Sequence, residues 1–314
     1  MKKSALILAL LAMLSLLLAA CAPQKSVFHI ELIVKGTETE FWQSVYDGAK
    51  AAAGNSAQLS FLGPEVEKDY RDQVELLAGA IERAPDAVIL AAGDYYIMAE
   101  PLERVVDAGI PVIMVDSAVD SEKWVSFVTT DNQRLGQTLA QELQARLPNS
   151  GSIGVISFVQ SSYPSVEREQ GFRSTMKNST RHRLLDTVYC DSNIDTAQAL
   201  TRQLVEQNPD LVGIVGLNAQ SATGAARALE ELSRTDIFMA GIDCTVEQAD
   251  YMELGIMQAA VLQNPYAMGY YSVKTTLDHL SGKLVEKMVY TDIHVVDKAN
   301  LFDDKYQQLV FPFV

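Results

Sequence analysis

The sequence predicts an α/β protein built from two doubly wound parallel sheets. Its strand-like segments are short and almost continuously apolar, as parallel strands are when both faces of the sheet are covered. Stretches with helical periodicity separate these segments, and the connections are short. Such alternation gives a parallel sheet with right-handed crossovers. Because it occurs as two series, before about residue 130 and after about residue 150, we expect two lobes.

The first series contains four predicted strands, at residues 27–35, 58–62, 87–92 and 111–116. The last of them has a clear start, because the preceding helix stops at Gly109 and Pro111 follows. Glycine commonly ends a helix, and proline does not continue one. These segments would form the sheet of the first lobe.

The second series contains four further predicted strands, at residues 152–159, 184–190, 211–217 and 237–243. A helix is predicted before them at 134–147, where leucine recurs every four residues along one side. Doubly wound sheets bind ligands outside the carboxyl ends of their strands. Two facing lobes would therefore share one ligand-binding cleft.

The N-terminal segment predicts export. Residues 1–20 begin with a basic pair and continue as an uncharged, mostly apolar run, which is the pattern of a secretory signal peptide. Leu-Ala-Ala directly before Cys21 resembles the lipobox of bacterial lipoproteins. The resemblance implies a lipid on Cys21, a tether at 21–26 and a location on the extracytoplasmic face of the bacterial cell membrane. The alternative is an ordinary signal peptide followed by an incidental cysteine.

Composition excludes several classes of function. The formal net charge is −15, with acidic residues scattered along the chain, so we expect no nucleic-acid partner. The four histidines lack metal-binding spacing, and no nucleophile elbow or glycine-rich phosphate loop is present in the sequence. We therefore expect a protein that is not an enzyme, with no metal and no cofactor.

Seven segments, in their order and spacing, are similar to blocks of the ribose- and galactose-type periplasmic sugar-binding proteins. They read FWQSVYDGAKAAA, DAGIPVIMVDS, TTDNQRLG, EREQGF, GLNAQSATGAARAL, GIDCT and VLQNPYAMGY. The resemblance extends from about residue 27 to the C-terminus. It implies the type I periplasmic binding protein fold, a monomer whose two lobes are joined by a three-crossover hinge and close around a ligand.

The family topology also implies where the lobes divide. The N-terminal lobe would comprise residues 27–130 and about 264–291, and the C-terminal lobe residues 131–263 and about 292–314. In the implied strand order, about three spacings of about 4.8 Å separate Cys190 from Cys244. A disulfide needs Cα atoms within about 7 Å, so we expect two free thiols.

The resemblance implies seven ligand-binding residues, which are Phe41, Trp42, Asp116, Arg168, Asn218, Asp243 and Gln263. Phe41 and Trp42 suit the apolar CH faces of a sugar. We expect one ring to face the cleft and the other to cap the core, without assigning which. Asp116, Asn218 and Asp243 end predicted strands, where their polar groups would meet hydroxyls.

Three of these positions have plainer alternatives. Asp116 would otherwise be a loop or helix-cap residue. Arg168, expected at the start of a helix, offers a planar fork of donors, but it would otherwise be a surface residue paired with Glu167 or Glu169. Gln263 would otherwise be only a hinge residue.

Three positions depart from the ribose-type pattern. Thr39, Ser117 and Ala219 stand where an amide, an arginine and an acidic residue are usual, so ribose itself is not expected. Asp116, Asp243 and Arg168 together carry one negative charge, which favours a neutral or cationic ligand. Further candidates for ligand contacts are Thr39, Ser117, Tyr95 and Tyr163, although ordinary loop packing explains the two tyrosines equally well.

The function implied is that of a lipid-anchored receptor that closes on a sugar or related polyol and delivers it to the permease of an ABC importer. The alternative is a sensor, in which the same closure signals to a membrane receptor such as a histidine kinase. The sequence does not separate these two roles.

Overall fold

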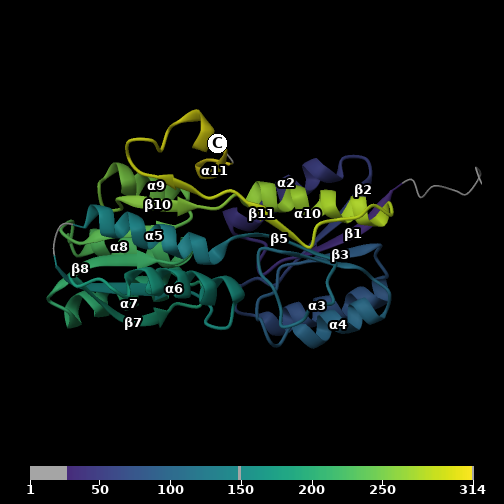
Figure 1. Ribbon diagram of the computed structural model, residues 1–314, viewed down its shortest axis with the longest axis horizontal. Coiled ribbons are helices and arrows are strands. Elements are labelled where there is room, and N and C mark those ends of the chain that lie inside the picture. Colours follow the sequence, from purple (N-terminus) through teal and green to yellow (C-terminus); the bar gives the residue numbers. More distant parts are fainter. Residues whose placement is uncertain (1–26, 148–149, 313–314) are drawn as a thin grey trace, which may run out of the picture.

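The computed structural model describes residues 27–147 and 150–312, which form two α/β lobes lying side by side (Figure 1). The predicted signal peptide at 1–20, Cys21 and the tether at 21–26 lie outside the described residues. Among the helices of the described part, none is long and apolar enough to cross a membrane.

Lobe one is built on a six-stranded parallel sheet in the order β11-β5-β4-β3-β1-β2. Its strands are β1 (Phe28–Ile33), β2 (Ala57–Leu62), β3 (Ala87–Leu90), β4 (Val112–Val115), β5 (Ser126–Thr130) and β11 (Met288–Thr291). One face is covered by α2 (Glu40–Ala53) and α10 (Pro265–Leu280), which pack against each other. The other is covered by α3 (Tyr70–Arg83) and α4 (Ala99–Asp107) (Figure 1).

Lobe two has the sheet order β12-β10-β9-β8-β6-β7, in which β12 runs antiparallel to β10 and the other pairs are parallel. Its strands are β6 (Gly151–Ser157), β7 (His182–Tyr189), β8 (Leu211–Gly216), β9 (Phe238–Ile242), β10 (Ala259–Leu262) and β12 (His294–Val296). Its helices are α5 (Asn132–Arg146), α6 (Tyr163–Met176), α7 (Ile194–Gln207), α8 (Ala219–Glu231), α9 (Val246–Glu253) and α11 (Asp304–Val310). Helix α5 packs on α6, and α7 packs on α8.

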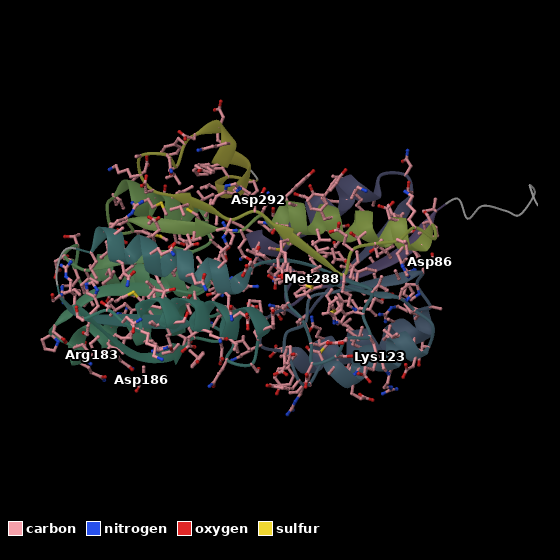
Figure 2. The ribbon with its side chains drawn as sticks, viewed as in Figure 1. Asp86, Lys123, Arg183, Asp186, Met288 and Asp292 are labelled. Carbon is pink, nitrogen blue, oxygen red and sulfur yellow. The ribbon has the colours of Figure 1, made fainter. Side chains whose placement is uncertain are left out.

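The described chain passes between the sheets after β5, between β10 and α10, and between β11 and β12. Asp292, labelled in Figure 2, lies in the last of these connections. The sheet order agrees with two doubly wound lobes, so the predicted fold class is confirmed. The exact residues at which the lobes divide stay a prediction.

Each of the eight predicted strands corresponds to a strand of the structure. The strands β5, β10, β11 and β12, which have three to five residues each, are not predicted from the sequence. Strands β3 and β4 are equally short, but they lie in longer apolar runs at 87–92 and 111–116, whereas β5 reads Ser-Phe-Val-Thr-Thr and does not stand out as an apolar segment. They are strands because neighbouring strands of the sheet supply their backbone hydrogen bonds.

Cys190 and Cys244 are both free, as expected, and both are buried. Burial raises the pKa of the Cys190 thiol to about 11 and that of Cys244 to about 12. Both side chains pack within the apolar core of lobe two. They behave there as small apolar groups, because desolvation keeps them protonated.

Candidate functional site

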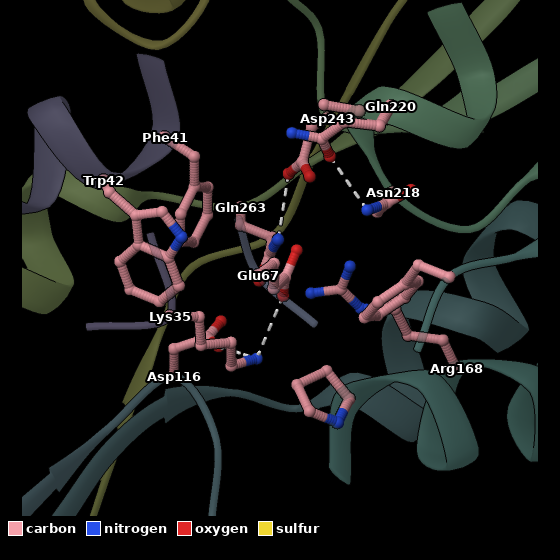
Figure 3. Close-up of a pocket in the computed structure, with 13 residues that line it drawn as sticks. Lys35, Phe41, Trp42, Glu67, Asp116, Arg168, Asn218, Gln220, Asp243 and Gln263 are labelled. Carbon is pink, nitrogen blue, oxygen red and sulfur yellow. Dashed lines mark hydrogen bonds and ion pairs between the residues drawn. The ribbon is translucent and has the colours of Figure 1, made fainter. Parts of the chain in front are cut away.

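A small polar cavity lies between the lobes at the carboxyl ends of their strands (Figure 3). We call it the central cavity; its volume is about 40 Å³, room for roughly three water molecules. All seven residues implied by the resemblance line it, together with Lys35, Glu67, Phe158, Pro164, Ala219 and Gln220. The structure therefore brings together side chains that are more than 200 positions apart in the sequence.

Two aspartates hold equivalent places in the two lobes. Asp116 directly follows β4 and Asp243 directly follows β9, and both adopt a left-handed backbone, with φ of 61° and 69°. Aspartate is among the few residues with a Cβ that tolerate this region. The conformation turns each chain sharply at the strand end while leaving its carboxylate at the cavity. Such strained positions are often retained at binding sites.

Lys35 is a site residue that the sequence analysis did not identify. It follows β1 and is only 1% exposed. Its Nζ lies 2.9 Å from Asp116 Oδ2, 3.7 Å from Glu67 Oε1 and 3.3 Å from Ser162 Oγ of lobe two. The sequence pattern predicts only the end of an apolar strand at this residue. The sequence signal for the site is a lysine at the carboxyl end of a buried strand, because a charge buried there needs a partner of opposite charge.

Arg168 lies in the second turn of α6 and not at its start, contrary to the sequence expectation. It is 3% exposed and pairs with neither neighbouring glutamate, so the surface alternative is wrong. Its Nε donates to Asn132 Oδ1 (2.8 Å) and its Nη1 donates to the Leu217 carbonyl (3.0 Å). These two acceptors fix the guanidinium plane at the cavity wall (Figure 3).

The close packing of α5 on α6 sets the position of Arg168. A Cβ atom at Gly136 of α5 would lie 2.0 Å from the carbonyl oxygen of Arg168. The two backbones approach this closely because position 136 has no side chain. The helix that carries Arg168 is thereby held at a fixed distance from the cavity.

The two amide side chains of the cavity, Asn218 and Gln263, differ in how many of their hydrogen-bonding groups have partners. Asn218 caps α8 with its Oδ1 on Ser221 N (2.9 Å), and its Nδ2 donates to Ser192 and Gln220. Gln263 donates from Nε2 to Asp243 Oδ1 (2.9 Å), while its Oε1 is buried without a hydrogen-bond partner among the described residues. A buried acceptor without a donor is unfavourable, so this atom favours a ligand that offers a hydrogen.

Both rings of the aromatic pair line the cavity. They meet edge to face at 4.9 Å, with Phe41 partly buried and Trp42 4% exposed. Trp42 also belongs to the apolar core of lobe one. Phe41 packs against the same core, so both rings contact the core as well as the cavity, and the expectation of one ring for each was wrong.

The four further candidates do not line the central cavity. Thr39 is the N-cap of α2 and accepts from Trp42 N, and Ser117 is buried and donates to the Ala92 carbonyl. Tyr95 and Tyr163 stack across the two lobes with ring centroids 6.0 Å apart, and Tyr95 N donates to the Ser161 carbonyl (3.0 Å). The tyrosines therefore join the lobes at the edge of the cleft.

Two cations and three carboxylates line the central cavity, leaving one net negative charge. Burial lowers the pKa of Arg168, opposed by the charges of Asp243 and Asp116. Burial raises the pKa of Asp243, opposed by Arg168 and by the Gln263 hydrogen bond. Such a buried, charge-dense site strengthens each polar contact with a bound molecule. Within the described residues, no group of His, Cys, Asp or Glu side chains is placed to hold a metal ion.

A family model described as a periplasmic binding protein domain matches residues 30–284. The chain belongs to the periplasmic binding protein family. This confirms the resemblance to ribose- and galactose-type members, and the family is one of solute-binding proteins and not of enzymes.

Individual relatives span nearly the whole of this periplasmic binding protein. The D-ribose/D-allose-binding protein of Pseudomonas aeruginosa is 24% identical over 268 residues, covering 82% of this chain and 84% of its own. An ABC transporter solute binding protein from Agrobacterium vitis, solved with bound D-fucose, is 30% identical with a TM-score of 0.87, covering 90% of this chain and 100% of that one. A sugar transporter structure from Clostridium phytofermentans is 35% identical with a TM-score of 0.80, covering 86% and 99%.

Proposed function

We propose that this protein is an extracytoplasmic receptor that closes on a neutral sugar and delivers it to an ABC importer. The observation that carries the proposal is the central cavity itself, where an aromatic pair from one lobe faces hydrogen-bonding side chains from both lobes. An apolar ring face beside converging donors and acceptors matches a sugar, which has CH faces and hydroxyl edges. The sugar ligands and import roles named for the relatives support the same class.

Lobe closure is the step that would couple binding to delivery. In this conformation the central cavity has a volume of only about 40 Å³, so seating a sugar in it requires the lobes to separate and then close around the ligand. Contacts between the lobes, including Lys35 with Ser162 and Tyr95 with Ser161, would break on opening and form again on closure. Importer docking would then recognise the closed form.

A binding screen tests the sugar class. We expect a neutral pentose or hexose to raise the melting temperature, because a ligand at 100 times its Kd contributes about 2.7 kcal/mol, or roughly 4 °C in a protein of this size. Sugar phosphates and uronic acids serve as the control, and we expect no shift because the cavity is net negative. If the folded protein responds to no neutral sugar or polyol, the proposal is wrong.

We further propose that a lipid on Cys21 holds the protein at the membrane. The support is the sequence pattern at residues 1–21 alone. We expect the Cys21→Ser variant to be released from washed membranes into the soluble fraction, whereas wild type stays with the membranes. Equal fractionation of both forms would contradict the anchor.

A further inference from the structure

A second, larger space lies beside the central cavity, and we call it the side chamber. Its volume is about 310 Å³, several times that of the central cavity. Four residues line both spaces: Phe41, Ala219, Asp243 and Gln263. The two spaces therefore meet at a shared wall, and a molecule seated in one lies directly beside the other.

The side chamber has the chemistry of a carbohydrate subsite. Phe41, Leu262 and Pro265 provide apolar surface, and Ser44, Thr223 and Thr245 provide hydroxyls. Apolar faces interspersed with a few fixed polar groups are typical of sites for small hydroxylated ligands. Leu309, on α11, closes part of the chamber from the C-terminal segment.

The charges of the side chamber restrict its occupant. Glu38, Glu40 and Glu247 line it together with Asp243, and no lysine, arginine or histidine is among its lining residues. Glu247 is paired with Arg227, whose Nε and Nη2 donate at 2.6 and 2.8 Å, and so carries its own counter-ion. The other three carboxylates have no cation among the lining residues, and they accept hydrogen bonds and repel anions. Hydroxyl groups fit this wall, whereas a uronate or phosphate does not.

The second observation is Gln263 Oε1. This atom is buried, lacks a hydrogen-bond partner among the described residues, and belongs to a side chain that is 3% exposed. Gln263 points into the site in Figure 3 and lines both the central cavity and the side chamber. A donor placed at the junction of the two spaces would satisfy it.

We propose that the side chamber is a second sugar subsite, and that the natural ligand is a neutral disaccharide or glycoside with one ring in the central cavity and its second unit in the chamber. The inference rests on the proposed sugar-receptor function. It explains why the cleft holds a space larger than the central cavity on the far side of Phe41 and Asp243. A ligand confined to the central cavity would leave this space without a role.

Calorimetric titration of the purified protein tests the inference. D-galactose, D-glucose, D-ribose and D-fucose are compared with lactose, melibiose, cellobiose and maltose. We expect at least one disaccharide to bind about tenfold or more tightly than its component monosaccharides. If monosaccharides bind and every disaccharide binds more weakly, the second subsite is refuted while the receptor function stands. If neither set binds, the receptor function fails as well.

Two variants locate the second unit. Leu309→Trp and Thr223→Leu enlarge side chains that line only the side chamber. We expect each to weaken disaccharide binding about tenfold or more and to change monosaccharide binding by less than about threefold. Leu254→Trp, at a 64% exposed leucine of the same lobe, is the matched control and should change neither. If Leu309→Trp and Thr223→Leu both fold and retain wild-type disaccharide affinity, the second sugar unit does not occupy the side chamber.

Discussion

Replacing Arg168 by alanine will weaken sugar binding about 100-fold or more and destabilise the protein by on the order of 3 kcal/mol. The guanidinium is 3% exposed and fixed by Asn132 and the Leu217 carbonyl, so its remaining donors are pre-oriented toward the cavity. Its removal leaves two buried acceptors without their donor. Calorimetric titration and urea unfolding measure the two effects separately.

The same variant should change how stability depends on pH. Arg168 is the largest influence that lowers the pKa of Asp243, which burial already raises. Without it the folded-state pKa of Asp243 rises further above the unfolded value. A carboxyl group with a raised folded pKa favours folding at low pH, and that contribution is lost as pH rises through the folded pKa. The destabilisation of Arg168→Ala should therefore be larger at pH 8 than at pH 5.

Arg173→Ala is the matched control for Arg168. It lies five residues further along α6, forms an ion pair with Glu169 at 2.7 Å and does not line the central cavity. We expect sugar affinity within about threefold of wild type. An Arg168→Ala protein that is folded and binds sugar normally would contradict the assignment of this residue to the site.

Replacing either residue of the buried ion pair Lys35–Asp116 will destabilise the protein by about 3 kcal/mol, whereas replacing both residues will destabilise it much less. The two side chains are 1% and 5% exposed, and their charged atoms are 2.9 Å apart. Lys35→Met leaves a buried carboxylate and Asp116→Asn leaves a buried ammonium. The double variant leaves neither of these charges, and the third member of the cluster, Glu67, is 16% exposed, so we expect the double variant to recover at least half of the lost free energy of unfolding.

A double-mutant cycle by urea unfolding measures this coupling. Asparagine suits position 116 because it tolerates the positive φ found there. The exposed pair Lys50–Asp47, whose side chains are 52% and 39% exposed, is the control, with an expected coupling below about 1 kcal/mol. A Lys35–Asp116 coupling free energy no larger than that of the control would contradict a strong interaction between the two buried charges. Sugar binding should remain impaired in the double variant, because both groups line the cavity.

The apolar and polar pattern of the chain indicates the two doubly wound lobes, eight of the strands that the structure describes and the polar residues at their carboxyl ends. These features are local. An apolar run that ends in Asp116 or Asp243 marks a buried strand and a strand-end carboxylate wherever the strand lies in the sheet. The seven residues carried over from the family blocks all line one cavity for the same reason, because each block places its residue at a strand end or an early helical turn facing the cleft.

The interactions among those groups depend on how distant segments pack together. Lys35 became a site residue because Asp116 and Glu67, far from it in the chain, lie within 4 Å of its ammonium group. The short strands β5, β10, β11 and β12 exist because neighbouring strands complete their hydrogen bonds. The side chamber is formed by residues from α2, α8, α9, α10 and the C-terminal helix. A cavity is a property of surfaces that meet, and the sequence pattern of each surface alone does not reveal the space left between them.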